Sequence, residues 1–212
     1  RLRSALQFSL NIPAVKALAV IGNDPVQAKA EAMGVTFRDD EVDAGLSFAL
    51  GVEEVHVKDL VRAYGTLANG GKLVYQTTII TATDGAGREL IGPETSPEPE
   101  QVVEPGTAGI MTDILADNTN PKVNPYWGRF KITEGNRRRP ATLKTGTNND
   151  ARDLNAYGYI GAPSTKERAD GEYALAVAAW NGNSDNSLVS TASDPLFSID
   201  VTAHVWQGFL QE

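Results

Sequence analysis

Apolar residues recur every three to four positions over much of the first half of the chain, which is the spacing of one helix face. The pattern predicts helices over residues 2–10, 13–21, 25–33, 57–68 and 107–115. Pro13 suits the first turn of a helix, because its missing N–H has no partner to lose there. Gly22, Gly34 and the pair Gly70-Gly71 follow at places where helices commonly end.

A different pattern, rich in β-branched residues, predicts a strand over residues 73–83, and Asp84 to Gly87 can turn it into a short partner at 88–91. Residues 93–104 are interpreted as an acidic loop, and 117–140 as a long polar stretch. Three strands are expected over 141–145, 156–160 and 173–180, with the last buried on both faces because its polarity hardly alternates. A closing helix is expected over 201–210, with Asp200 as its cap. This order predicts a mixed α and β fold, an antiparallel sheet packed by helices.

Composition is that of a globular chain, with 41% hydrophobic and 22% charged residues. The net charge of −8 argues against a nucleic acid partner, which needs a concentrated positive face. The run Arg137-Arg138-Arg139 is interpreted as a solvated loop before a strand rather than an anion site. No apolar run approaches the length of a membrane span, and no signal peptide precedes the amphipathic pattern, so targeting information is expected outside these residues.

Residues for several kinds of chemistry are missing. The absence of cysteine excludes disulfides and thiolate nucleophiles. The two histidines, His56 and His204, have no partner at ligand spacing and are interpreted as structural. The segment from Asn181 to Asn186 has the composition of a surface turn rather than of a calcium-binding loop. We therefore expect neither a metal nor another cofactor.

Lys144-Thr145-Gly146-Thr147 is the strongest chemical signal. It ends a predicted strand, where a glycine lets a ligand backbone come close. A lysine beside two hydroxyls on such a strand can bind an extended peptide with a free carboxylate. K-T-G occurs together with S-x-x-K and S-D-N in penicillin-binding proteins and class A β-lactamases. The tetrapeptide therefore predicts a serine acyl-transferase site.

A second motif of that set is a serine two positions before an asparagine, and the chain offers two candidates. Ser184-Asp185-Asn186 matches the literal S-D-N but follows the K-T-G strand and reads as a surface turn. Ser9-Leu10-Asn11 lies upstream, at a junction between two predicted helices. Ser9 and Asn11 are therefore the candidates, and Ser184 is expected elsewhere on the surface.

The chain resembles the C-terminal part of the transpeptidase domain of class A, or bifunctional, penicillin-binding proteins. The likeness follows the family order along nearly the whole chain, at residues 2–15, 49–51, 63–71, 144–149, 152–153, 158–159, 180–183 and 205–206. Two features depart from the family. No serine is followed three residues later by lysine, so the nucleophile motif and the strands before it are expected outside this chain. Asn155 also stands where the family usually has tryptophan.

The resemblance implies a D,D-transpeptidase that cross-links peptidoglycan stem peptides through an acyl-serine and binds β-lactam antibiotics. It assigns catalytic roles to Ser9, Asn11 and Lys144, and substrate binding to Thr145, Gly146 and Thr147. It further implies a place on the extracytoplasmic face of the bacterial cell membrane. The missing N-terminal segment is an expected partner, and residues 1–212 are expected to be a partial domain. In that domain, residues 1–140 would be mostly helical with the S-x-N motif and a hairpin, and 141–212 would carry K-T-G.

Three alternatives remain open from the residues alone: a serine β-lactamase, a non-catalytic ligand-binding or structural domain of the same fold, and an unrelated sheet protein with a chance K-T-G-T. The distance between the Ser9 and Lys144 side chains would distinguish the unrelated sheet protein from the other two alternatives. In the family fold, the Ser9 and Lys144 side chains should approach to about 3–5 Å. The three closing strands should pair antiparallel in sequence order, and the last of them should be an edge within this chain.

Overall fold

A three-stranded antiparallel sheet forms the centre of the molecule, with the order β5 (Lys144–Thr147), β6 (Asp153–Ile160) and β7 (Leu175–Gly182). The structure is a computed structural model that describes residues 1–38, 44–93, 95–148, 151–161, 174–191 and 193–212. In the register, Lys144 lies opposite Tyr157, and Asn155 lies opposite Trp180. The predicted pairing and sequence order are confirmed; residue 173 of the third predicted strand lies outside the described residues.

The central strand is the buried one, so the expectation that the last strand is buried on both faces is wrong. The side chains of β6 are buried from Ala156 to Ile160, whereas most of β7 is partly or fully exposed. The reason is position: β6 has a strand on each side, and β7 pairs with β6 alone among the described strands. The predicted edge is therefore present.

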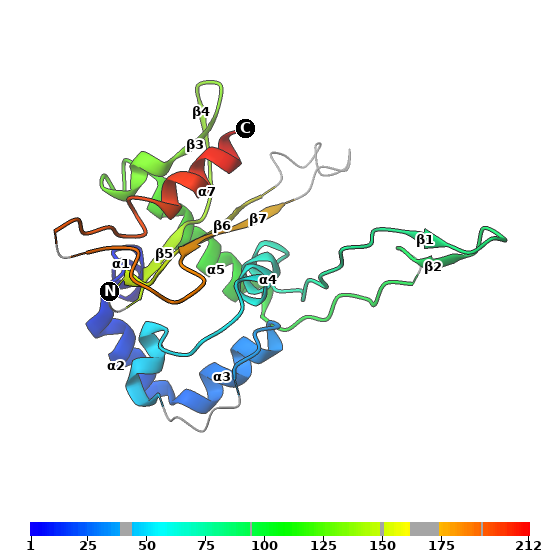
Figure 1. The fold of residues 1–212 in the computed structure, drawn as a ribbon, viewed down its shortest axis with the longest axis horizontal. Helices are drawn as coiled ribbons and strands as arrows, with labels where there is room; N and C mark the ends of the chain where they lie inside the picture. Colours follow the sequence, from blue (N-terminus) through cyan, green and yellow to red (C-terminus); the bar gives the residue numbers. More distant parts are fainter. Residues whose placement is uncertain (39–43, 94, 149–150, 162–173, 192) are drawn as a thin grey trace.

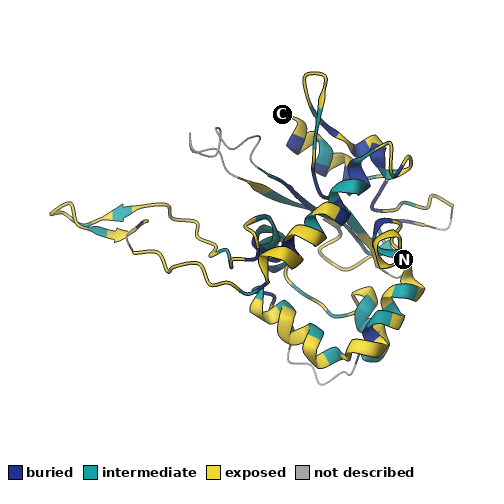
Figure 2. Ribbon diagram, turned by 180° about the vertical axis from the view of Figure 1, so that it is seen from behind, coloured by how far each residue is buried: buried dark blue, intermediate teal, exposed yellow. Residues whose placement is uncertain are grey.

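The helix α7 (Thr202–Gln211) covers one face of the sheet, and α4 (Val57–Ala68) with α5 (Pro105–Ala116) covers the other (Figure 1). The α7 side holds the main apolar core, which includes Phe130, Leu143, Ala156 and Trp206. On the α4 side, the ring of Tyr64 stacks on Tyr157 at 5.6 Å between centroids. Buried residues gather where these layers meet (Figure 2).

The N-terminal helices follow the predicted pattern closely. They are α1 (Leu2–Gln7), α2 (Asn11–Ile21) and α3 (Asn23–Ala32), followed by the 3-10 helix η1 (Gly45–Leu50). Gly22 ends α2 with a φ of 88°, a conformation that glycine adopts without strain. At the other end of the chain, the predicted cap of α7 is wrong. Asp200 accepts a hydrogen bond from the Phe197 N–H instead, and α7 begins after Val201.

The strand predicted over residues 73–83 is mostly wrong. Only β1 (Ala82–Thr83) pairs, with β2 (Glu89–Ile91), and the other residues of 73–93 and 95–100 form an extended arm that projects from the body (Figure 1). Ile79 and Ile80 on this arm are exposed. A β-branched run has the propensity of a strand, but no other described element packs beside it to make a sheet face.

The arginine run does not form the predicted loop. It is β4 (Arg137–Arg139), which pairs antiparallel with β3 (Ile132–Glu134) around a turn at Gly135. Before this hairpin lie the short 3-10 helices η2 (Asp117–Thr119) and η3 (Trp127–Phe130). Arg138 donates to the carbonyl oxygen of Ala116 at 3.4 Å, which ties the hairpin to the end of α5.

Candidate active site

Ser9 occupies an unusual backbone position at the end of α1. The Leu10 N–H donates to the Ala5 oxygen at 2.9 Å, and the Ser9 N–H donates to the Leu6 oxygen at 3.1 Å. These two bonds define a helix end in which the residue at Ser9 takes the left-handed conformation, usually a glycine. Ser9 adopts it with a φ of 53°. A serine at this position costs about 1 kcal/mol or more in backbone strain, which supports a role for its hydroxyl.

Lys144, at the start of β5, meets that hydroxyl. Its Nζ donates to Ser9 Oγ at 2.7 Å across 135 positions of sequence, and to the Thr145 carbonyl oxygen at 2.8 Å. Burial lowers the Lys144 pKa to about 8. The residue keeps part of its surface in contact with solvent, but the atoms packed around the ammonium group remove most of its hydration. The structure thus brings two of the predicted site residues into direct contact.

The outer edge of β5 is open to a ligand. Thr142 donates its N–H to the Tyr159 oxygen, so residue 142 faces β6. Leu143 and Thr145 have their carbonyl oxygens bonded to Asn118 and to Lys144 Nζ, on the other side. Because backbone groups alternate along a strand, the N–H of Thr147 faces the same outer edge. An extended peptide with a free carboxylate can approach this edge without displacing any described strand.

A residue that the motifs do not reveal, Ser198, organises the end of this strand. It lies just before α7, 51 positions from Thr147, and is buried. Its hydroxyl donates to the Gly146 oxygen and accepts from the Asn155 N–H, so it bridges β5 and β6. The Thr147 hydroxyl accepts from the Ser198 N–H and lies 2.8 Å from Ser198 Oγ. Nothing in the sequence pattern places Ser198 beside K-T-G, because only the packing of α7 brings it there.

Counting donors and acceptors shows which hydroxyl donates each hydrogen bond in this network. A serine hydroxyl has one hydrogen and two lone pairs. Since Ser198 gives its hydrogen to Gly146, the Thr147 hydroxyl must donate to Ser198. The Thr147 side chain is therefore engaged away from the edge, while its backbone N–H remains there. Thr145 Oγ1 makes no hydrogen bond to any described residue and is the freer hydroxyl.

Of the other two residues considered from the sequence, one lies near Ser9 and the other lies in a separate surface turn. Asn11 is the first residue of α2, two positions after Ser9, and is exposed. Ser184 lies in an exposed turn after β7, as predicted. Within the described part of the chain, no group of three or more metal-binding side chains comes together. No described helix has the length and hydrophobicity needed to cross a bilayer.

Comparison with known proteins agrees with this geometry. No family model matches the chain. Penicillin-binding protein 2D of Bacillus subtilis is 28% identical over 212 residues, covering 100% of this chain and 27% of that protein. Penicillin-binding protein 1A of Neisseria flavescens is 31% identical, covering 92% of this chain and 25% of that protein. The solved structure of PonA1 from Mycobacterium tuberculosis in complex with penicillin V superposes with a TM-score of 0.72 at 19% identity, covering 100% of this chain and 55% of that one.

The fold and the paired motifs define a segment of a penicillin-binding transpeptidase domain. The chain belongs to the class A penicillin-binding proteins, which are its homologues over its whole length. It spans about a quarter of the length of these curated relatives. An unrelated sheet protein with a chance K-T-G-T is excluded, because both the family and the contact between Ser9 and Lys144 argue against coincidence.

Proposed function

We propose that this chain supplies the S-x-N and K-T-G motifs of a D,D-transpeptidase that cross-links peptidoglycan stem peptides through an acyl-serine intermediate. The observation that carries the proposal is the 2.7 Å hydrogen bond between Lys144 Nζ and Ser9 Oγ, which joins the two motifs in one site. The nucleophilic serine belongs to an S-x-x-K segment that these 212 residues do not contain. Residues 1–212 thus form a partial transpeptidase domain, with the helical S-x-N part in 1–140 and the K-T-G part in 141–212.

Ser9 relays a proton in this reaction. Acylation forms an ester between the nucleophilic serine and the carbonyl carbon of the penultimate D-alanine, and breaks the bond to the terminal D-alanine. The proton that the nucleophile loses must reach the departing amine. Because Lys144 donates to Ser9 Oγ, the Ser9 hydrogen remains available to that amine. Asn11, the first residue of α2, holds the substrate amide and orients the lysine of the S-x-x-K motif.

Lys144 and the strand edge bind the carboxylate end of the substrate. The positive charge of Lys144 attracts that carboxylate, and Thr145 offers a hydroxyl that no described residue engages. Gly146 leaves space at the strand, since a Cβ there would meet no atom within 4 Å. The Thr147 N–H, at the open edge, stabilises the developing oxyanion. The Thr147 hydroxyl joins carboxylate binding only after it releases Ser198.

The natural ligands follow from this site. They are a stem peptide that ends in D-Ala-D-Ala and the β-lactams that mimic it; penicillin V is bound in the similar PonA1 structure. Cross-linking takes place outside the cytoplasm, so the working protein lies on the outer face of the bacterial cell membrane. The S-x-x-K segment is the partner that completes the site.

Labelled penicillin tests the proposal. We expect the 212-residue chain alone to form no covalent adduct, because removal of the nucleophile of a serine enzyme costs on the order of 10⁶ in rate. The same chain joined to its own S-x-x-K segment should acylate one to one. Intact mass spectrometry measures both results. Ser9→Ala and Lys144→Met in the joined protein should slow acylation by roughly 10²-fold or more.

Two outcomes would contradict the proposal. A stoichiometric adduct on the isolated chain would show that the nucleophile lies within these residues. A folded joined protein that stays unmodified would show that the paired motifs do not serve acyl transfer. Ser184→Ala is the matched control for Ser9→Ala, because Ser184 also belongs to a Ser-x-Asn sequence but lies in an exposed turn.

A further inference from the structure

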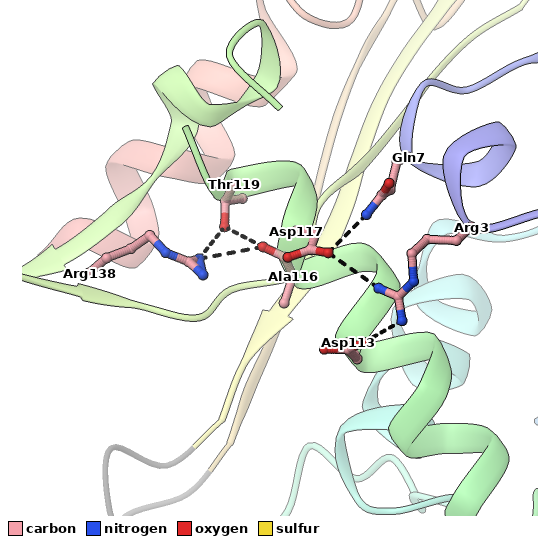
Figure 3. A network of polar contacts seen from close by, with 7 residues as sticks. All are labelled: Arg3, Gln7, Asp113, Ala116, Asp117, Thr119 and Arg138. Carbon is pink, nitrogen blue, oxygen red and sulfur yellow. Dashed lines mark hydrogen bonds and ion pairs between the residues drawn. The ribbon is translucent and has the colours of Figure 1, made fainter. Parts of the chain in front are cut away.

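The end of α5 and the short helix η2 contact both elements that carry the candidate site. On one side they contact α1, which ends at Gln7, two residues before Ser9 (Figure 3). The Arg3 guanidinium contacts Asp113 and donates to Asp117 Oδ2 at 3.2 Å. Gln7 Nε2 donates to the same Asp117 oxygen at 3.0 Å, and Gln7 is the buried residue of α1. Asp117 is thus bonded to α1 only two residues before Ser9.

On the other side the same corner holds the strand that carries Lys144. Asn118 Nδ2 donates to the Leu143 oxygen at 2.7 Å, and Thr119 Oγ1 donates to the Ala141 oxygen at 2.7 Å. Both bonds are buried, and Leu143 directly precedes Lys144. Three consecutive residues, Asp117 to Thr119, therefore connect side chains of α1, the helix before Ser9, with the backbone next to Lys144.

The placement of Asp117 opposes what α5 alone would favour. A carboxylate at the C-terminal end of a helix meets the negative end of the helix dipole, an arrangement that costs roughly 0.3–1 kcal/mol. Asp113 and Asp117 both lie at this end of α5, and no basic residue lies in the last turn to offset them. Arg138 donates to the Ala116 oxygen at this helix end, but the two carboxylates themselves are bonded by Arg3 and Gln7 on α1. The acids serve the contact with α1 rather than the stability of their own helix.

We propose that Asp117 is a positioning residue, which through Gln7 and Arg3 holds the end of α1 so that the Ser9 hydroxyl stays in contact with Lys144. The inference rests on the proposed function, since its consequence is the alignment of Ser9 for proton transfer. Asp117 itself does not touch the substrate. Without it, α1 keeps its helix and the bond that Asn124 Nδ2 donates to the Gln7 oxygen. It loses the bonds that the Arg3 and Gln7 side chains donate to Asp117, and Ser9 departs from Lys144.

Two substitutions of Asp117 separate this role from general stability. Asp117→Ala removes both bonds to α1, whereas Asp117→Asn keeps an oxygen that Gln7 and Arg3 can donate to. Arg88→Met is the matched control, because it breaks an ion pair with Asp84 on the exposed arm, far from the site in sequence and fold. In the 212-residue chain, NMR titration of the Lys144 side chain reports on its surroundings directly. We expect its midpoint, about 8 in the unchanged chain, to rise in Asp117→Ala and to stay in Arg88→Met.

Activity is measured in the protein that joins this chain to its S-x-x-K segment. We expect Asp117→Ala to slow penicillin acylation by roughly 10- to 100-fold, the range that a displaced catalytic group produces, and Asp117→Asn to recover most of that loss. A double-mutant cycle adds Ser9→Ala. If Asp117 acts through Ser9, then Asp117→Ala should cost less than about twofold in the Ser9→Ala background, because coupled residues are non-additive.

The outcomes are distinguishable. Failure of the unchanged joined protein to acylate overturns the proposed function. Normal acylation of the unchanged protein, together with equal acylation by Asp117→Ala, overturns the positioning role. Equal losses from Asp117→Ala with and without Ser9 also overturn it, because the residue would then act through general stability. If Asp117→Ala does not fold, Gln7→Met takes its place in the cycle, because it removes the bond from Gln7 Nε2 to Asp117. A loss of acylation in Gln7→Met that is equally large with and without Ser9 would contradict the proposal.

Discussion

Ser9 and Lys144 each occupy a position that is unfavourable for the side chain itself. Ser9 has the backbone conformation of a glycine, and Lys144 has an ammonium group that burial strips of water. The two side chains meet in the 2.7 Å bond from Lys144 Nζ to Ser9 Oγ. Strained backbone and perturbed pKa values concentrate at functional sites, so their coincidence in one contact supports a catalytic role for the pair.

The lowered Lys144 pKa predicts how stability depends on pH. Between about 8 in the folded chain and 10.5 in the unfolded chain, the unfolded state binds more protons, so stability rises with pH across that window. Lys144→Met does not titrate. We expect the difference in unfolding free energy, Lys144→Met minus the unchanged chain, to fall by roughly 1–3 kcal/mol from pH 7 to 10.5, after allowance for solvent screening. Urea unfolding of both chains measures this; a constant difference across the window would contradict the lowered pKa.

At the scale of elements, β6 shows how closely the sheet and α7 are packed. A Cβ on Gly158 would lie 1.9 Å from the Thr142 oxygen and 3.0 Å from Trp206 Nε1. Trp206 is fully buried, so it has no room to move aside. On the neighbouring strand, Gly146 faces open space instead. The two glycines therefore have different reasons to be there, one for packing and one for access of a ligand.

Alanine at each position separates these reasons. Gly158→Ala should destabilise the chain by about 3 kcal/mol or more, because it overpacks a rigid site. Gly146→Ala should change the unfolding free energy by less than about 1 kcal/mol and still slow acylation of the joined protein, since its methyl group occupies the approach to β5. Denaturant unfolding and the penicillin assay measure the two effects. A stable Gly158→Ala, or full activity in Gly146→Ala, would contradict the respective role.

At the scale of the whole molecule, a layered body carries the site and a separate arm projects from it (Figure 1). The base of the arm is anchored: the Leu73 N–H donates to the Glu100 oxygen at 2.7 Å, and Arg62 Nε donates to the Val74 oxygen at 2.6 Å. Most described residues beyond this base are exposed (Figure 2). The arm therefore contributes little to the core or to the geometry of the site.

Removal of the outer arm tests this separation. Replacing residues 78–98 by a short Gly/Ser linker should leave the unfolding free energy within about 1 kcal/mol, because little buried surface is lost and a shorter loop costs slightly less entropy to close. The Lys144 titration should keep its midpoint. Denaturant unfolding and NMR check both expectations. A large loss of stability would show that the arm packs on the body in solution.

Short-range sequence patterns correctly predicted much of the secondary structure. The spacing of apolar residues and the glycines at helix ends predicted α4 with its correct bounds. The sequence also predicted the order of the closing strands. They failed where neighbours outside the segment decide: the β-branched run of the arm has no sheet face beside it, and the arginine run pairs with β3. The motifs themselves selected Ser9 over Ser184 by their order along the chain, a choice that the contact with Lys144 supports.

The sequence by itself determined the family, the main helices, the antiparallel order of the closing strands and the residue types of the site, because these depend on short-range patterns and on motif order. Only the tertiary structure decided which strand is buried, which hydroxyl of K-T-G is free, and that Ser198 and Asp117 support the site. The last two depend on contacts between distant segments, such as Ser198 with Thr147, 51 positions apart, and Asp117 with Gln7, 110 positions apart. Long-range contacts arise from the packing of whole elements, and no local pattern encodes which side chains that packing brings together.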